Sequence, residues 1–292
     1  MWSLFRIGRA AVAASLLTPI AWRERPWGTW ALINLYLSLL SGIVVGLQYD
    51  YATPFFSTSA IDLLAPYGAF FRSLHFYSSQ FFFFCTAIHF CAVYPKTASY
   101  TYGEWLKLLG SLPIILLLLF TGYVLRGDNT GLSAGVIAEH ILVAVPLLGP
   151  PLNDLLFAIS ETGLRKVYVH HVIALDFFLL ILLWKHLRIY RIRLQDHPAA
   201  IAAVLLFAML ITAPLEPVLL GVDYISGPWF FLGLQELLRY LSPLVAGVII
   251  PGVFLVILAL THPASRRSGF FLYQTALWLA VYTVLTVIAW NR

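Results

Sequence analysis

Residues 73–94 read SLHFYSSQFFFFCTAIHFCAVY, an apolar run long enough to cross a membrane as one helix. Residues 168–189 read YVHHVIALDFFLLILLWKHLRI and form a second such run. Each run carries histidine near both of its ends: His75 and His89 in the first, and the adjacent His170 and His171 together with His186 in the second. Because an imidazole in hydrocarbon is costly without a partner, the pattern indicates a polar site shared by two membrane helices.

The composition extends this reading to the whole chain. Hydrophobic residues make up 61% of the 292 positions and charged residues 11%, whereas soluble proteins carry about 25% charge. A soluble enzyme, a disordered chain and a nucleic-acid-binding module are therefore excluded, and unbroken apolar runs exclude an outer-membrane barrel. We expect an all-α polytopic membrane protein with seven spans, at 28–49, 73–94, 106–125, 168–189, 199–220, 242–261 and 270–290.

Charge asymmetry predicts the orientation. The segments on the N-terminal side of the membrane hold 12 of the 18 basic residues but only three of the 13 acidic ones. Cytoplasmic loops are the ones enriched in lysine and arginine, so the N-terminus is expected in the cytoplasm. Residues 1–25 alternate arginines with apolar residues, which predicts an amphipathic helix lying in the interface. A signal peptide is the alternative, although the stretch lacks a clear small-x-small cleavage site.

We divide the chain into this interfacial helix (1–25), a four-helix bundle (26–195) and a three-helix C-terminal part (196–292). Two connections on the outer side are longer than turns. Residues 126–167 contain two predicted helices, at 132–145 and 151–159, and residues 221–241 contain an aromatic run beginning Gly-Pro-Trp-Phe-Phe. We expect the two connections to cover a pocket together.

The histidine spacing predicts which rings meet. His75 and His89 are 14 residues apart, and His171 and His186 are 15 apart. At 100° per residue each pair returns to within about 40–60° of one helix face, with a separation of about 21–22 Å along the axis. Parallel helices then place His75 opposite His171 and His89 opposite His186. Neutral imidazole is an axial ligand of haem iron, so the pattern favours two stacked b-type haems over histidines that only pack or donate hydrogen bonds. His170 is an alternative to His171.

Cations and glycines accompany the histidines. Arg72 precedes His75 by one turn, while Lys185 and Arg188 flank His186, where haem propionates would emerge. Their alternative role is to anchor helix ends at the membrane interface. Gly28 and Gly42 are also 14 residues apart, so the first span could approach two flat macrocycles closely.

With these features the sequence resembles the cytochrome b family of the cytochrome bc complexes. The resemblance rests on Arg72-Ser-Leu-His75 with His89, and on Tyr168-Val-His-His171 with His186. Thr121-Gly-Tyr-Val-Leu125 and Val145-Pro-Leu-Leu-Gly149 support it, and Gly227-Pro-Trp-Phe-Phe-Leu232 falls where the family has Pro-Glu-Trp-Tyr. The match covers about residues 25–290, nearly the whole chain.

The resemblance implies a di-haem subunit of a quinol-oxidising complex. His75 and His171 would bind an outer haem, His89 and His186 an inner haem, and Gly28, Gly42 and Gly122 would pack closely against them. Pro228, Trp229 and Phe230 would line an outer quinol pocket. A Rieske-type iron–sulfur protein or a multihaem cytochrome c would be the redox partner. The expected setting is a homodimer within a larger complex in the cytoplasmic membrane of a prokaryote.

Several positions depart from the family pattern. Pro228 replaces the family's glutamate, Arg126-Gly127 replaces a Pro-Trp pair, and the fourth family glycine falls near Leu108 or is displaced to Gly110. Quinol oxidation needs a base. We predict Glu236 as the substitute, with Asp128 and Glu216 as further candidates; a structural ion pair of Glu236 with Arg239 is the alternative.

Two other functions remain open at the level of sequence. The first is the di-haem, quinone-reactive anchor of a membrane dehydrogenase or reductase. Such anchors usually have fewer spans and lack the aromatic segment at 227–239. The second is a membrane protein without haem, whose histidines serve a proton pathway.

Overall fold

The computed structural model describes residues 20–23, 25–217 and 224–292. Within these ranges every regular element is a helix and no strand occurs, as the sequence predicts. The expected interfacial helix at 1–25 lies outside the described residues except for α2 (Ile20–Arg23) and Arg25.

Among the described residues, five helical stretches are long and apolar enough to cross a membrane. They are α3 (Trp27–Gly46), α5 (Gly68–Val93) with the 3₁₀ turn η1 (Tyr94–Ser99), α6 (Tyr102–Leu125), the α10–η2–α11 stretch (Arg165–Val169, His170–Leu175, Asp176–Ile189), and α15 (Ser268–Trp290). The protein is therefore a multi-pass membrane protein.

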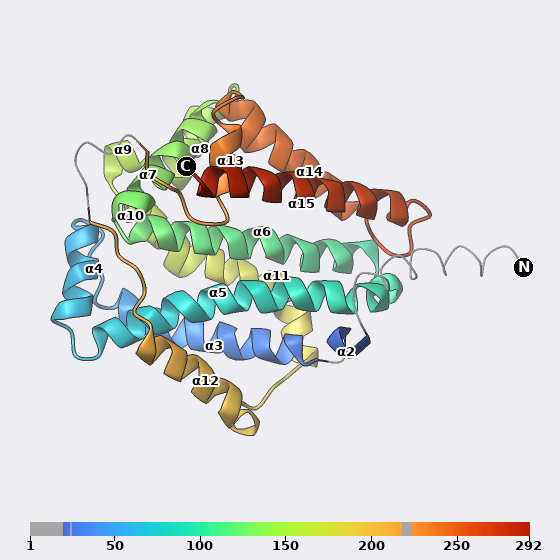
Figure 1. Cartoon of the computed structure of the whole chain (residues 1–292), viewed down its shortest axis with the longest axis horizontal. Helices are drawn as coiled ribbons and strands as arrows, with labels where there is room; N and C mark the ends of the chain where they lie inside the picture. Colours follow the sequence, from blue (N-terminus) through green and yellow to red (C-terminus); the bar gives the residue numbers. More distant parts are fainter. Residues whose placement is uncertain (1–19, 24, 218–223) are drawn as a thin grey trace, which may run out of the picture.

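Four of these stretches form one bundle, which runs across the centre of Figure 1. Their common core takes side chains from every member: Ala31, Leu32 and Leu35 of α3, Phe82 of α5, Ile115 of α6, and Leu179 and Leu183 of α11. Mutual burial of apolar side chains from four helices fixes their lateral order. Helices α3, α5, α6 and α11 therefore pack as one unit.

The two remaining predicted spans are shorter than expected. The span at 242–261 is the π turn η4 (Val245–Ile249) followed by α14 (Ile250–Ala259). The prediction of a span at 199–220 is wrong beyond residue 210, because α12 (Pro198–Leu210) ends there after 13 residues. From Ile211 to Pro217 the chain is not helical, because α5 side chains bind its backbone. The Tyr77 hydroxyl donates to the Thr212 carbonyl at 3.2 Å, and the Ala213 N–H donates to Ser73 Oγ at 2.9 Å.

Short helices gather at one end of the bundle, at the left of Figure 1. They include α4 (Pro54–Leu63), α7 (Asn129–Val143), α8 (Gly149–Leu156) and α9 (Ile159–Thr162), so the helices predicted at 132–145 and 151–159 are confirmed as α7 and α8. In the C-terminal part, α13 (Leu232–Leu237) packs against α15. The short turn η3 (Leu194–Asp196) precedes α12.

Candidate functional site

The bundle brings the four histidines together as two pairs. The ring centroids of His75 and His171 lie 6.1 Å apart with an interplanar angle of 87°, and we refer to these as the first pair. Those of His89 and His186, the second pair, lie 6.2 Å apart at 63°. All four side chains are half-buried. The pairs are those that the spacing predicts, and they bridge α5 to the α10–η2–α11 stretch.

A π turn explains how unequal spacings give matched levels. His171 lies in η2, the π-helical segment His170–Leu175, while the α5 histidines are joined by regular α-helix. Because a π turn closes with i→i+5 bonds, it holds one more residue than an α turn. The 15-residue spacing therefore matches the 14-residue spacing of α5 without the rotation that a regular helix would impose. The alternative ligand His170 faces elsewhere, with its Nε2 3.1 Å from the Leu155 carbonyl oxygen.

The ring separation in each pair is close to the one expected around a single metal ion. Metal–nitrogen bonds of about 2.0–2.1 Å place two ligating nitrogens about 4 Å apart, and the ring half-widths bring the centroids close to the observed separations. No group of three or more histidine, cysteine, aspartate or glutamate side chains suited to a metal occurs in the described ranges. Two protein donors suffice only when the metal brings its remaining ligands with it, as iron does in a porphyrin.

Glycines face three of the four rings. A Cβ atom built on Gly28 would lie 2.8 Å from Cε1 of His89, and one on Gly42 would lie 2.8 Å from Cε1 of His75. On Gly122 it would lie 3.2 Å from Cε1 of His171. Any larger residue would push these rings, so the three glycines fit the close-packing role predicted for them. Gly110 does not share this role, because its nearest neighbour is Leu182 Cδ1 at 3.8 Å.

Hydrogen bonds orient the rings of the first pair. Nδ1 of His75 lies 2.9 Å from the Ser38 carbonyl oxygen, to which it donates. Nδ1 of His171 lies 2.9 Å from Oγ1 of Thr121, whose own hydroxyl donates to the Leu117 carbonyl at 2.8 Å. Both Nδ1 atoms therefore carry the proton, which leaves Nε2 as the lone-pair nitrogen of each ring. Metal-binding histidines are commonly fixed in this way.

Known proteins resemble this chain in sequence and in fold. The sequence profile of the family described as cytochrome b/b6/petB matches residues 18–193, more than half of the chain. The chain belongs to the cytochrome b family. A cytochrome b of Python regius is 24% identical over 317 residues, covering 93% of this chain and 85% of the snake protein. A chain of a hyperthermophilic respiratory Complex III has a similar fold, with 20% identity and a TM-score of 0.62 over 90% of this chain and 82% of that one.

Members of the cytochrome b family bind b-type haem. In this chain, the three cations predicted to meet haem propionates do not share one environment. Arg72 is buried and forms an ion pair with Asp62 of α4, with its Nε 2.5 Å from Oδ1. Its Nη2 also donates to the Ala213 carbonyl at 2.6 Å. Arg72 therefore ties α5 to α4 and to the segment after α12, a structural role that the sequence does not reveal.

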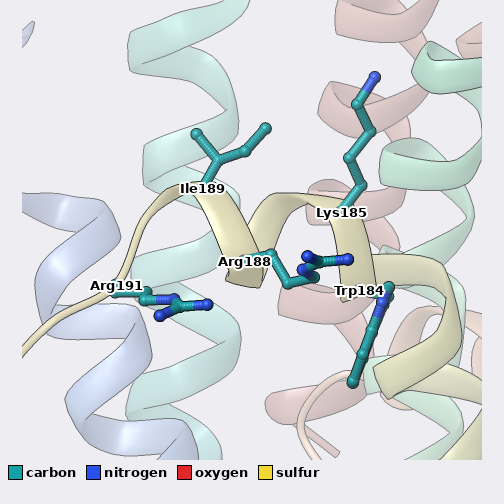
Figure 2. A pocket seen from close by; sticks show the side chains of 5 residues that line it. All are labelled: Trp184, Lys185, Arg188, Ile189 and Arg191. Carbon is teal, nitrogen blue, oxygen red and sulfur yellow. The ribbon is translucent and has the colours of Figure 1, made fainter.

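The other two cations lie at the far end of α11. Lys185 forms an exposed ion pair with Glu104, and Arg188 lies about 200° around the helix from His186. Together with Trp184, Ile189 and Arg191 they line an open hollow of about 430 Å³, and Figure 2 shows their side chains spread around the helix end. This placement favours the alternative role of anchors at the membrane interface over contact with a haem between the histidines.

The aromatic segment of this cytochrome b reaches into the side of the bundle. The Trp229 indole N–H donates to Gln80 Oε1 at 2.9 Å, and its ring stacks on Phe84 with centroids 5.0 Å apart. Phe230 meets the ring of Tyr123 at 5.6 Å, and Pro228 is fully buried. The segment thus packs against α5 and α6, and its α5 contacts Gln80 and Phe84 lie between His75 and His89 in the chain. The sequence suggested instead that it covers the end of the bundle.

Glu236 does not have the environment of a free base. It is only 1% exposed, and the Arg292 guanidinium donates to both of its oxygens, at 2.8 and 3.0 Å. The Tyr240 hydroxyl adds a third bond at 2.9 Å. The Arg292 hydrogen bonds lower the pKa of the Glu236 carboxyl below its ordinary value. The ion pair expected with Arg239 is formed with Arg292 instead.

The further candidates Asp128 and Glu216 lie together. The Glu216 backbone N–H donates to Asp128 Oδ2 at 3.1 Å, and the Thr130 hydroxyl donates to the Glu216 carboxylate. Asp128 is fully buried and caps α7 through the Gly131 N–H at 2.9 Å, while Glu216 is exposed. Sequence reasoning missed that Asp128 is paired with Arg126, and their spacing of two residues was the available signal.

Proposed function

We propose that this chain is the di-haem b subunit of a bc-type quinol:cytochrome c oxidoreductase. The observation that carries the proposal is the pair of histidine levels, each with opposed rings 6.1–6.2 Å apart and a glycine against at least one ring. The levels are separated by 14 residues of α5, a rise of about 21 Å that spans most of the hydrocarbon.

The residues of the chain would hold and insulate the haems, which supply one-electron redox chemistry when bound. Nε2 of each first-pair histidine is the free ligand nitrogen, since Ser38 and Thr121 occupy Nδ1. Apolar side chains such as Phe82 and Leu179 fill the bundle core and exclude water from it. A dry, rigid setting keeps ligand orientation constant as the charge of the iron changes.

Quinol would be oxidised beside the aromatic segment, at the end of the bundle assigned to the outer face by the charge asymmetry. Trp229 and Phe230 offer flat apolar surfaces to a quinone ring. Electrons would then pass between the histidine levels toward the cytoplasmic side. A Rieske-type iron–sulfur protein or a multihaem cytochrome c would receive the other electron, in a homodimeric complex of a prokaryotic inner membrane. The similarity to a Complex III chain supports only the membership of a larger respiratory complex.

Glu236 enters this proposal as a residue to be tested. A carboxylate held by Arg292 is a weak base, so it must leave that ion pair before it can accept a proton from quinol. We expect a Glu236→Gln variant to keep its quinol turnover. Loss of turnover with an intact haem spectrum would restore Glu236 as the proton acceptor.

A reduced-minus-oxidised absorption spectrum of the purified protein tests the proposal directly. We expect a b-type α-band, two haems per chain by iron and pyridine haemochrome assay, and reduction of both haems by quinol. Absence of the α-band would exclude every haem function and leave the proton-pathway alternative. In sealed vesicles that contain the protein, haem that quinol reduces only from the cytoplasmic side would favour the dehydrogenase-anchor alternative.

A further inference from the structure

Arg126 is a buried arginine at the end of α6 whose hydrogen bonding is incomplete. It is 7% exposed, and its Nη2 forms an ion pair with Asp128, which is 0% exposed. Gly127 between them has φ +66°, and a Cβ there would lie 2.5 Å from Cβ of Pro54. Only glycine fits this turn, so the turn that brings Arg126 and Asp128 together is built into the backbone.

The Nε atom of Arg126 is buried and has no hydrogen-bond partner in the described part of the chain. Arg72, also buried, provides the contrast. Its Nε and Nη2 both bind Asp62, and further bonds go to the carbonyls of Ala213 and Pro214. A buried guanidinium N–H without an acceptor is costly, so such groups are normally satisfied by the protein, by water or by a ligand.

The position of Arg126 links it to the aromatic segment. Its guanidinium carbon lies 4.7 Å from the centre of the Tyr123 ring, a cation–π contact. The same ring also contacts Phe230 and Phe76, each with centroids 5.6 Å away. Tyr123 is therefore a shared neighbour of Arg126 and Phe230. This contact connects the unpaired donor to the aromatic surface to which the proposed function assigns quinol.

We propose that Arg126 Nε binds an oxygen of the quinone or quinol. The N–H donates to a carbonyl oxygen of the quinone or to a hydroxyl oxygen of the quinol, while Nη2 stays on Asp128. The pair then orients the substrate ring along Tyr123 and Phe230, in a chain whose aromatic segment has Pro228 where its family has a carboxylate. This inference rests on the proposed function for the identity of the ligand.

Equilibrium binding of a decyl-substituted benzoquinone to the purified, haem-loaded protein tests the proposal without turnover. We expect Arg126→Lys to raise the Kd at least about tenfold, because one hydrogen bond in a buried site is lost. Lysine keeps the charge beside Asp128 but cannot present two donors in a fixed fork. Arg165→Lys is the matched control, since Arg165 is an exposed arginine at the start of α10 and is expected to leave the Kd unchanged.

A second variant distinguishes a loss of quinone binding from a folding defect. Arg126→Gln combined with Asp128→Asn removes both charges together, and asparagine still caps α7. We expect this double variant to retain the haem spectrum and to show the same raised Kd. An unchanged Kd in both variants would overturn the inference while leaving the proposed function standing. Failure of the unmodified protein to bind the quinone would overturn both, whereas a raised Kd without quinol-dependent haem reduction would support the inference alone.

Discussion

The two histidine pairs have similar ring separations but different surroundings. In the first pair both Nδ1 atoms are fixed by hydrogen bonds, to Ser38 and Thr121, and both rings face a glycine. In the second pair only His89 faces a glycine, and His186 lies against the ring of Tyr190, with centroids 4.7 Å apart. Groups inside the bundle thus fix the ring orientation of the first pair. The second pair instead lies near the end of α11, where Tyr190 contacts His186. We expect the first site to be the more rigid and the more sensitive to substitution.

Removing a ligand should have the largest effect and should separate the two levels. We expect His171→Ala and His186→Ala each to lose about half of the b-type haem, because one axial bond is lost in each. The two variants should lose haems of different midpoint potential in a redox titration followed at the α-band. Loss of both haems in either variant would mean that the levels do not assemble independently.

Filling a glycine position should come next. Gly42→Ala places a Cβ 2.8 Å from the His75 ring, so the ring must move and the haem at the first level should bind weakly or not at all. Gly110→Ala is the matched control, because its Cβ would meet only Leu182 at an ordinary 3.8 Å. Haem content per chain is the measurement. Equal haem content in the two variants would contradict the packing role of Gly42.

Loosening the orientation of a ring should have a smaller effect. Thr121→Val keeps the shape of the side chain but removes the acceptor for His171 Nδ1, and such changes typically cost about 10–100-fold in metal affinity. We expect haem to dissociate faster from the first level, measured by transfer to apomyoglobin. Tyr190→Phe at the second level should leave dissociation nearly unchanged, because it retains the ring contact with His186. Equal rates in the two variants would remove the difference between the sites.

The smallest effect is expected at the cations of the second level. Lys185→Ala removes an exposed ion pair with Glu104, and exposed pairs contribute about 0–1 kcal/mol. Haem content and both midpoint potentials should match those of the unmodified protein. A clear shift in the potential of the second-level haem would show that Lys185 does interact with a propionate after all.

The histidine pairing could be predicted because helix periodicity determines most of it, although the π turn that matches the 15-residue spacing to the 14-residue spacing was not predicted. A 14-residue spacing in α5 fixes the faces of His75 and His89 whatever the rest of the chain does. Apolar length likewise predicted the long helices, and the glycines followed from their spacing and from the family resemblance.

Long-range pairings could not be predicted in the same way. Glu236 binds Arg292, 56 residues away, and Arg72 binds Asp62 and the Ala213 carbonyl. No local pattern encodes such partners, because they depend on how separate helices pack. The early end of α12 has the same origin, since side chains of α5 compete for the backbone of residues 212–213. Local apolar character alone indicated a longer helix there.

The π turn at His170–Leu175 has a consequence for how this chain tolerates changes in length. Because the turn stores one surplus residue, deleting a single residue such as Ile173 would convert it to ordinary α-helix and leave His171 and His186 at their present levels. A deletion anywhere in the regular helix of α5 between His75 and His89 would instead rotate one ligand by about 100°. The helical stretch that carries His171 and His186 can therefore lose one residue and keep its ligands in place, whereas α5 cannot.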